Sequence, residues 1–211
     1  MKQYRKRLII TSIITILPIL VGIFFWKQLP DTIATHFGSN NAADGWSSKA
    51  STVFGLPLFF LVIHLFCVCV TLNDPKKKNI GRMMLAVIFW IVPVISIVSN
   101  GSILAYALGM QIDMTMIVSI MMGILFIVLG NYMSKNQQNY TVGIKIPWTL
   151  SSEENWNKTH RIASKLWVVA GIVFIANIFL RSAEIILVVI ACTVLIPVIY
   201  SFILYKRENR L

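Results

Sequence analysis

Long runs of apolar residues, separated by shorter polar segments, dominate the pattern along the chain. A helix that crosses a bilayer needs about 20 predominantly apolar residues, and six runs reach or approach that length. They are Leu8–Trp26, Val53–Leu72, Met83–Leu108, Met114–Met133, Leu166–Leu180 and Ile185–Tyr205. The fifth run is short, so its helix is expected to begin a turn earlier. The pattern predicts an all-α, polytopic membrane protein built as a six-helix transmembrane bundle.

Composition supports the same class. Apolar residues make up 57% of the chain and charged residues 13%, whereas soluble domains are about 45–50% apolar and about 25% charged. The first apolar run is longer than the core of a cleavable signal peptide, which has about 7–15 residues. We therefore interpret it as a retained first span.

The basic residues predict how the chain is oriented. With the N-terminus in the cytoplasm, nearly all of the 19 Lys and Arg residues fall in cytoplasmic segments, and the exceptions are Lys27, Lys49 and Arg181. Cytoplasmic loops of membrane proteins carry an excess of Lys and Arg. The distribution predicts that both termini are cytoplasmic, and it explains the net charge of +11 without direct binding of nucleic acid.

Two polar loops are long enough to carry a function, and this topology places them on opposite sides of the bilayer. Residues 27–52 form an outer loop, and residues 134–165 form an inner one. We predict an N-terminal two-helix module over residues 1–72, followed by a four-helix region over residues 73–211.

The inner loop contains an expected helix start. Ser151 with Glu154 three residues later matches a capping box, with Ser151 as the N-cap. The helical face that follows would carry Trp156, His160, Ala163 and Trp167. This pattern favours an amphipathic helix that lies in the cytoplasmic interface and then turns into the fifth span. An aromatic belt followed by a plain connector is the alternative.

The inner loop also resembles the signature of the SdpI family of bacterial membrane proteins. The resemblance rests on Gly-x-(Arg/Lys)-x-Pro-Trp-Thr-Leu followed by Trp and then Thr-His-Arg, a long and spaced pattern. The matching residues are Gly130, Asn131, Asn139, Gly143–Lys145, Pro147–Leu150, Trp156 and Thr159–Arg161. The outer loop is similar to the short module of unknown function that often precedes this signature. Lys145 departs from the usual arginine, which keeps the charge but loses the planar, two-pronged donor.

The resemblance implies a receptor-like protein of the bacterial cell membrane that is not an enzyme and carries no cofactor. The family's namesake protects the cell from a secreted, membrane-active peptide toxin and holds a small repressor protein at the membrane. For this chain it implies a peptide toxin outside and a repressor inside as partners, besides the lipid bilayer. The inner docking or switching surface would comprise Asn139, Gly143, Lys145, Pro147, Trp148, Thr149, Trp156, His160 and Arg161.

The outer loop is the expected place of contact with the toxin. Thr32–Phe37 alternates enough for a short strand, and Ala43-Asp44-Gly45 is typical of a tight turn. The candidate contact residues are Asp31, His36, Asp44 and Trp46. A capped connector without a binding role is the alternative.

An enzymatic function has little support in the sequence. No H-E-x-x-H, G-x-S-x-G or C-x-x-C motif occurs. The three histidines are far apart, since one lies in the outer loop, one in a predicted span and one in the inner loop. Neither a catalytic site nor a metal site is therefore predicted. The three cysteines lie in apolar runs and are interpreted as packing residues.

A small-molecule or ion transporter is the main alternative function. His64, Asn100 and Asn177 lie within predicted spans, and an ionisable group in a span is a functional hypothesis by default. However, interhelical hydrogen bonds from such side chains also occur as ordinary structural contacts in helical membrane proteins.

Overall fold

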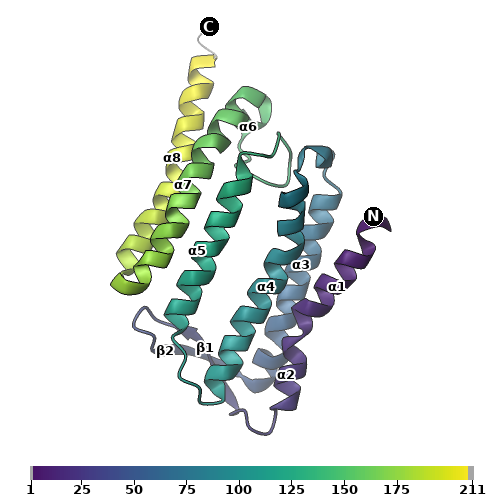
Figure 1. Cartoon of the computed structure of the whole chain (residues 1–211), viewed down its shortest axis with the longest axis vertical. Coiled ribbons are helices and arrows are strands. Elements are labelled where there is room, and N and C mark those ends of the chain that lie inside the picture. The colour runs from purple at the N-terminus through teal and green to yellow at the C-terminus, as the bar shows by residue number, and fades with distance from the viewer. Residues whose placement is uncertain (1, 209–211) are drawn as a thin grey trace. The chain divides into compact units, whose positions relative to one another are not determined.

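The computed structural model describes residues 2–208 and is largely helical (Figure 1). Within that range, six helices are long and apolar enough to cross a membrane. They cover Arg5–Phe24, Ser51–Leu72, Arg82–Ala107, Met114–Met133, Glu153–Leu180 and Ala183–Glu208. Each contains or overlaps one of the six apolar runs, which confirms an all-α, multi-pass membrane protein. The cytoplasmic placement of both termini stays a prediction.

Prolines interrupt some of these helices and not others. The first span consists of α1 (Arg5–Ile16) and α2 (Pro18–Phe24), preceded by the short 3₁₀ turn η1 (Lys2–Tyr4). Pro18 starts α2 because proline has no N–H to continue the preceding helix. Pro93 and Pro197 instead lie inside the continuous helices α4 (Arg82–Ala107) and α8 (Ala183–Glu208). The remaining helices are η2 (Ser51–Gly55, π-helical), α3 (Leu56–Leu72), η3 (Lys77–Asn79), α5 (Met114–Met133), α6 (Pro147–Ser151) and α7 (Glu153–Leu180).

The fifth span differs from the prediction at its N-terminal end. The expected interfacial helix and the expected span form one uninterrupted helix, α7, which begins at Glu153. Its N-cap is Ser152, whose Oγ accepts a hydrogen bond from the backbone N–H of Asn155 at 3.1 Å. The assignment of Ser151 as the N-cap was therefore wrong by one residue, because Ser151 ends the separate helix α6. The predicted apolar face is confirmed, since Trp156, His160 and Ala163 are buried.

The chain forms two compact units. The first comprises Met1–Cys69 and Ile88–Val118, and the second comprises Val70–Val87 and Ser119–Leu211. The helices α3, α4 and α5 each contribute residues to both units. The domain boundary at residues 72/73 stays a prediction.

The outer loop belongs to the first unit and forms an antiparallel hairpin of β1 (Thr32–Phe37) and β2 (Ala43–Ser48). Strand β1 confirms the predicted strand with the same bounds. The expected turn at Ala43-Asp44-Gly45 was wrong, because these residues open β2. The connection lies at Gly38–Ala42, where the N–H of Gly38 donates to the carbonyl of Ala42 at 2.9 Å. Asn41 takes the positive φ of 63° that such a turn needs.

Asn41 also joins the hairpin to the start of α5. Its Oδ1 accepts the N–H of Met114 at 2.8 Å, and its Nδ2 donates to the carbonyl of Ile112 at 3.2 Å. The first N–H groups of a helix have no partner within the helix, so this side chain acts as a cap supplied from a distant segment. A small core forms in the same unit from Leu29, Ile33, Val53 and Leu104, and Ile33 belongs to β1.

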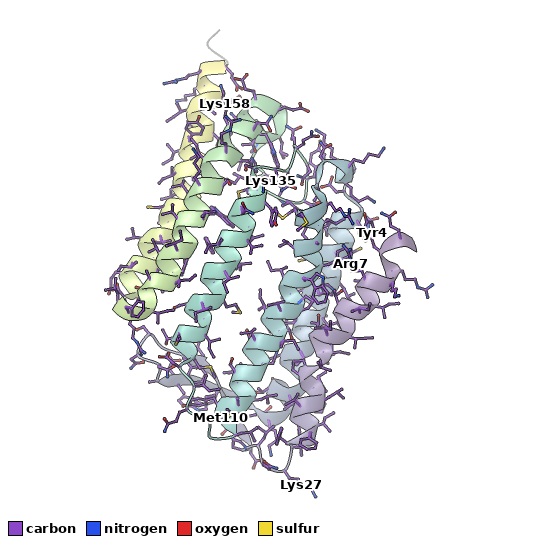
Figure 2. All side chains as sticks on the ribbon, viewed as in Figure 1. Tyr4, Arg7, Lys27, Met110, Lys135 and Lys158 are labelled. Atoms are coloured by element: carbon purple, nitrogen blue, oxygen red, sulfur yellow. The ribbon has the colours of Figure 1, made fainter. Side chains whose placement is uncertain are left out.

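Aromatic and cationic contacts lie at the N-terminal end of α1 in the first unit. Figure 2 labels Tyr4 and Arg7 at this end. Tyr4 stacks on Phe89 with ring centroids 5.8 Å apart, and the guanidinium of Arg7 lies 5.6 Å from the centre of the same ring. Lys27 and Met110 lie at the other end of this unit, where the hairpin is found. Such aromatic and basic groups are typical of the membrane–water interface.

In the second unit, α7 and α8 run side by side as an antiparallel pair (Figure 1). Helix α5 approaches α7 through small residues. A Cβ on Gly130 would come within 2.9 Å of the carbonyl of Ser164 and of Val168 N, and one on Gly171 would meet Gly123 O and Ile127 N. Small residues let transmembrane helices approach until their backbones touch. This gives Gly130, part of the family signature, a packing role.

We expect Gly130→Ala and Gly171→Ala to destabilise the second unit by about 1–3 kcal/mol each, the usual range for overpacking. Gly101→Ala is the matched control, because a Cβ at this helical glycine meets nothing within 4 Å. Thermal unfolding of the purified chain, followed by helical circular dichroism, measures the difference. Equal midpoints for Gly130→Ala and Gly101→Ala would contradict the close packing of α5 on α7.

Candidate functional site

The inner loop of the second unit is built around Trp156, which is fully buried at the start of α7. Its indole Nε1–H donates to the carbonyl of Asn136 at 3.0 Å. The ring of His160, one turn later, stacks on the indole with centroids 3.9 Å apart. Burial of this pair ties the chain that follows α5 to the first turns of α7.

His160 is also buried, and its two ring nitrogens have different roles. Nε2 accepts the backbone N–H of Ile144 at 2.9 Å, and Nδ1 lies 2.7 Å from the carbonyl of Trp156. An acceptor at Nε2 carries no hydrogen, so Nδ1 carries it and donates to that carbonyl. The contacts therefore define a neutral imidazole with one tautomer. The side chain holds the loop in place and has no room for a direct partner.

Gly143 lies directly against this pair. It has a φ of +122°, and a Cβ there would collide with His160 Nε2 and the Trp156 ring. Glycine is thus required twice, by its backbone conformation and by the closeness of the imidazole. This accounts for the glycine of the signature in physical terms.

Buried side chains accept hydrogen bonds from the backbone N–H groups of residues 140–142. Asn139 Oδ1 accepts from the N–H groups of Thr141 at 3.0 Å and Val142 at 2.7 Å. Asp74 Oδ2 accepts from the N–H of Tyr140 at 2.9 Å and from the hydroxyl of Thr141. An irregular segment cannot satisfy its own amides, and here two buried acceptors do so.

The loop between α3 and α4 packs against the same segment. Asn136 Oδ1 accepts the N–H of Gly81 at 2.8 Å, and Asn79 Nδ2 donates to the carbonyl of Gln138 at 2.6 Å. Gln138 Oε1 accepts from Lys76 Nζ at 2.5 Å. The basic segment at residues 73–82 therefore supports the inner loop directly.

The helix α6 is fixed by Thr149, which is fully buried. Its Oγ1 accepts the N–H of Ile146 at 3.1 Å and lies 2.7 Å from the carbonyl of Ile144. Gln138 Nε2 donates to the carbonyls of Thr149 at 3.0 Å and Leu150 at 2.9 Å. The Pro-Trp-Thr-Leu part of the signature thus folds as one capped helical turn.

Helix α8 receives two contacts from the motif at Ser201. Trp148 Nε1 donates to Ser201 Oγ at 2.8 Å, and Asn155 Nδ2 donates to the Ser201 carbonyl at 2.9 Å. The Trp148 ring also packs on Phe202 and Tyr205, with centroids 5.3 Å and 6.0 Å away. Trp148 is therefore half-buried and joins the loop to the last helix.

The nine predicted docking residues divide by exposure. Asn139, Thr149, Trp156 and His160 are buried and maintain the loop's shape. Gly143 and Trp148 are half-buried, and the exposed members are Lys145, Pro147 and Arg161. Lys145 Nζ donates to the carbonyl of Thr141 at 2.8 Å, so its charge is held at the loop surface. A partner would meet a cationic and apolar surface of few residues.

The four predicted outer-loop residues lie on or beside the hairpin. His36 Nδ1 and Asp44 Oδ1 form an exposed pair 2.5 Å apart. Asp31, which precedes β1, lies 3.2 Å from Lys49 Nζ. Trp46 on β2 is 61% exposed. The hairpin therefore brings together charged groups and one exposed indole.

The three intramembrane polar residues do not share one site. His64 and Asn100 are buried in the first unit. Asn177 belongs to the second, where its Oδ1 and Nδ2 bond the N–H and carbonyl of Ser182 at 3.2 Å each. It closes the turn between α7 and α8. Within the described residues, no group of three His, Cys, Asp or Glu could hold a metal ion.

Sequence reasoning missed five residues on which the loop depends. They are Asp74, Asn136, Gln138, Asn155 and Ser201. The only signal was the run of amides at 136–139 beside aromatic residues. Their partners lie up to 67 positions away, so no local pattern could identify them.

Asp74→Asn should loosen the loop, because the amide replaces an acceptor that several donors face. A buried donor left unpaired costs about 1–3 kcal/mol. We expect faster tryptic cleavage after Lys145, detected by mass spectrometry of the fragments. Asp31→Asn, with an exposed carboxylate, is the control and should cleave at the wild-type rate. Equal rates for both variants would argue against the role of Asp74.

Gly143→Ala should disturb the Trp156–His160 stack, and Gly109→Ala should not. Both glycines have positive φ, but a Cβ on Gly109 meets nothing within 4 Å. The backbone strain is thus shared, and only Gly143→Ala adds overpacking of about 1–3 kcal/mol. We expect a red shift of tryptophan emission for Gly143→Ala alone. The same shift in both variants would contradict the close contact.

Comparisons with known proteins cover nearly the whole chain. Residues 135–201 match the SdpI/YfhL protein family, and residues 13–61 match a domain of unknown function, DUF1648. The chain is 30% identical over 207 residues to the immunity protein SdpI of Bacillus subtilis strain 168, covering 97% of this chain and 98% of that protein. No solved structure matches. The family match begins in the amide-rich segment and ends at Ser201, the residue of α8 that the motif contacts. This chain belongs to the SdpI family.

Proposed function

We propose that this chain is an immunity protein of the bacterial cell membrane that protects its host from a secreted, membrane-active peptide toxin. The observation that carries the proposal is the similarity to the immunity protein SdpI over almost the full length of both chains. Because the alignment includes both long loops, it favours a common function over a shared scaffold alone.

The outer hairpin is the proposed place of toxin contact. It presents Trp46 together with the His36–Asp44 pair. An exposed indole near headgroups suits a peptide that partitions into the interface, and the paired charges would select among peptides. Asp31 and its Lys49 partner flank the hairpin. Exposed ion pairs contribute little to stability, so these groups are available for recognition.

The inner loop is the proposed surface for a cytoplasmic partner, such as a small repressor. Its exposed residues Lys145, Pro147 and Arg161 favour a partner with an acidic patch, because complementary charge guides association. The buried members of the motif would keep this surface in one conformation. A relay would require that occupancy outside change this conformation.

The proposal is tested by survival of a toxin-sensitive bacterium that expresses the chain, challenged with a panel of secreted membrane-active peptides. We expect protection against at least one peptide, relative to cells with an empty vector. Membrane insertion is verified in parallel. An inserted chain that protects against none of the panel would count against immunity.

If the inner surface takes part, Arg161→Ala should lower protection while leaving the protein inserted. Loss of one charged contact would weaken docking by about tenfold, equivalent to about 1.4 kcal/mol. Lys158→Ala is the matched control, since Lys158 is exposed nearby and pairs with Glu154 on the same helix. Full protection by Arg161→Ala would remove this residue from the proposed surface.

Transport is the second candidate, and the observation that favours it is the burial of His64 and Asn100 in an apolar unit. An ionisable side chain at such a position often belongs to a substrate or ion path. A coupled transporter would depend most on His64, whereas an immunity protein would depend most on its two long loops. The two functions are distinguished by comparing the effect of substituting His64 with the effects of substitutions in the two long loops.

A further inference from the structure

A set of buried polar side chains connects three helices of the first unit. Thr11 and Thr15 come from α1, His64 from α3, and Ser96 and Asn100 from α4. All five are at most 2% exposed. Polar groups buried among apolar helices are costly unless each finds a partner. Each donor and acceptor of these five side chains is therefore expected to have a hydrogen-bond partner.

Thr11 links α1 to α3. Its hydroxyl lies 3.0 Å from the carbonyl of Arg7 and 3.1 Å from that of Leu8, so its one hydrogen points along its own helix. Thr11 Oγ1 also lies 2.9 Å from His64 Nε2. With the hydroxyl hydrogen engaged, this oxygen accepts from Nε2–H. The neutral imidazole then has a bare acceptor at Nδ1.

Ser96 links α1 to α4. Thr15 Oγ1 donates to the carbonyl of Thr11 at 2.8 Å, and Ser96 Oγ donates to the carbonyl of Thr15 at 2.8 Å. Asn100 Nδ2 donates to Ser96 O at 2.8 Å and Ser96 Oγ at 3.2 Å. Every donor of these side chains is therefore in use, and none remains for the Asn100 carbonyl oxygen.

Two buried acceptors are left over. His64 Nδ1 and Asn100 Oδ1 have no hydrogen-bond partner among the residues that the structure describes. Rotating the Asn100 amide would not help, because its oxygen would then face the Ser96 carbonyl. The cluster therefore has more acceptors than donors. Only a group from outside these side chains can supply the missing hydrogens.

We propose that this polar cluster is a binding site for a small hydrogen-bond donor, which donates to His64 Nδ1 or Asn100 Oδ1. Water has this chemistry, and so does an ammonium-type cation. The helices α1, α2, α3 and α4 contain no Asp or Glu, so no carboxylate stands by to balance a charge. This favours neutral water as the occupant. Neither the family match nor the relative's name assigns a site to these residues.

The site is tested on the wild-type chain in lipid nanodiscs, with ring nitrogens of histidine labelled with ¹⁵N. The His64 signals are assigned by their loss in His64→Leu. We expect Nδ1 to carry no hydrogen, to show the shift of a hydrogen-bonded acceptor, and to receive magnetisation from solvent water. The Nδ1 shift is then compared in equal concentrations of ammonium chloride and of choline chloride, to distinguish an ammonium-type occupant from water. A shift with ammonium alone identifies a cation, and no shift with either salt identifies water.

The proposal is overturned if Nδ1 itself carries the hydrogen, or if it shows the shift of a free acceptor without contact to water or ammonium. Asn100→Leu provides an independent check. We expect loss of this second acceptor to change the His64 Nδ1 signal less than dehydration of the sample, which removes the occupant. An Nδ1 signal unchanged by dehydration would also count against the site. The readout does not depend on toxin protection, so this inference and the proposed function can fail separately.

Discussion

The need to satisfy the backbone amides of an irregular segment governs the family motif. Residues 140–146 form no regular structure, yet most of their N–H groups bond to buried side chains. The acceptors belong to Asp74, Asn139, His160 and Thr149. An irregular segment has no regular ladder of backbone hydrogen bonds, so its amides need other acceptors. The acceptors that bond these amides come from four different parts of the chain. The polar residues of the motif thus act first as replacements for the partners that a helix or sheet would provide.

The residues of the signature have two separate roles. The Trp156–His160 stack, Gly143 and Thr149 maintain the fold of the loop, and they leave Lys145, Pro147 and Arg161 exposed. The buried residues of the signature thus maintain the loop, and its exposed residues form a small surface. Lys145, where the resemblance leads us to expect arginine, lies on that exposed part, so a change of side chain there leaves the buried contacts in place.

Much of the architecture could be predicted, because it depends on local periodicity. The six spans, strand β1 and the buried face of α7 all follow from the spacing of apolar residues. The hairpin turn and the N-cap at Ser152 were missed, since several neighbouring residues could serve equally well. Asp74, Gln138 and Ser201 could not have been found, because their partners are distant in sequence. Within the motif, exposure separated residues that the sequence pattern had grouped.

The central claim is that buried side chains hold the inner loop in one conformation. Hydrogen–deuterium exchange of the chain in nanodiscs tests it directly at the N–H groups of Tyr140, Val142, Ile144 and Ile146. The account predicts exchange far slower than in an unstructured peptide, with protection at all four positions. Exchange at the rate of a free peptide would show that the loop is not held, and would contradict the account.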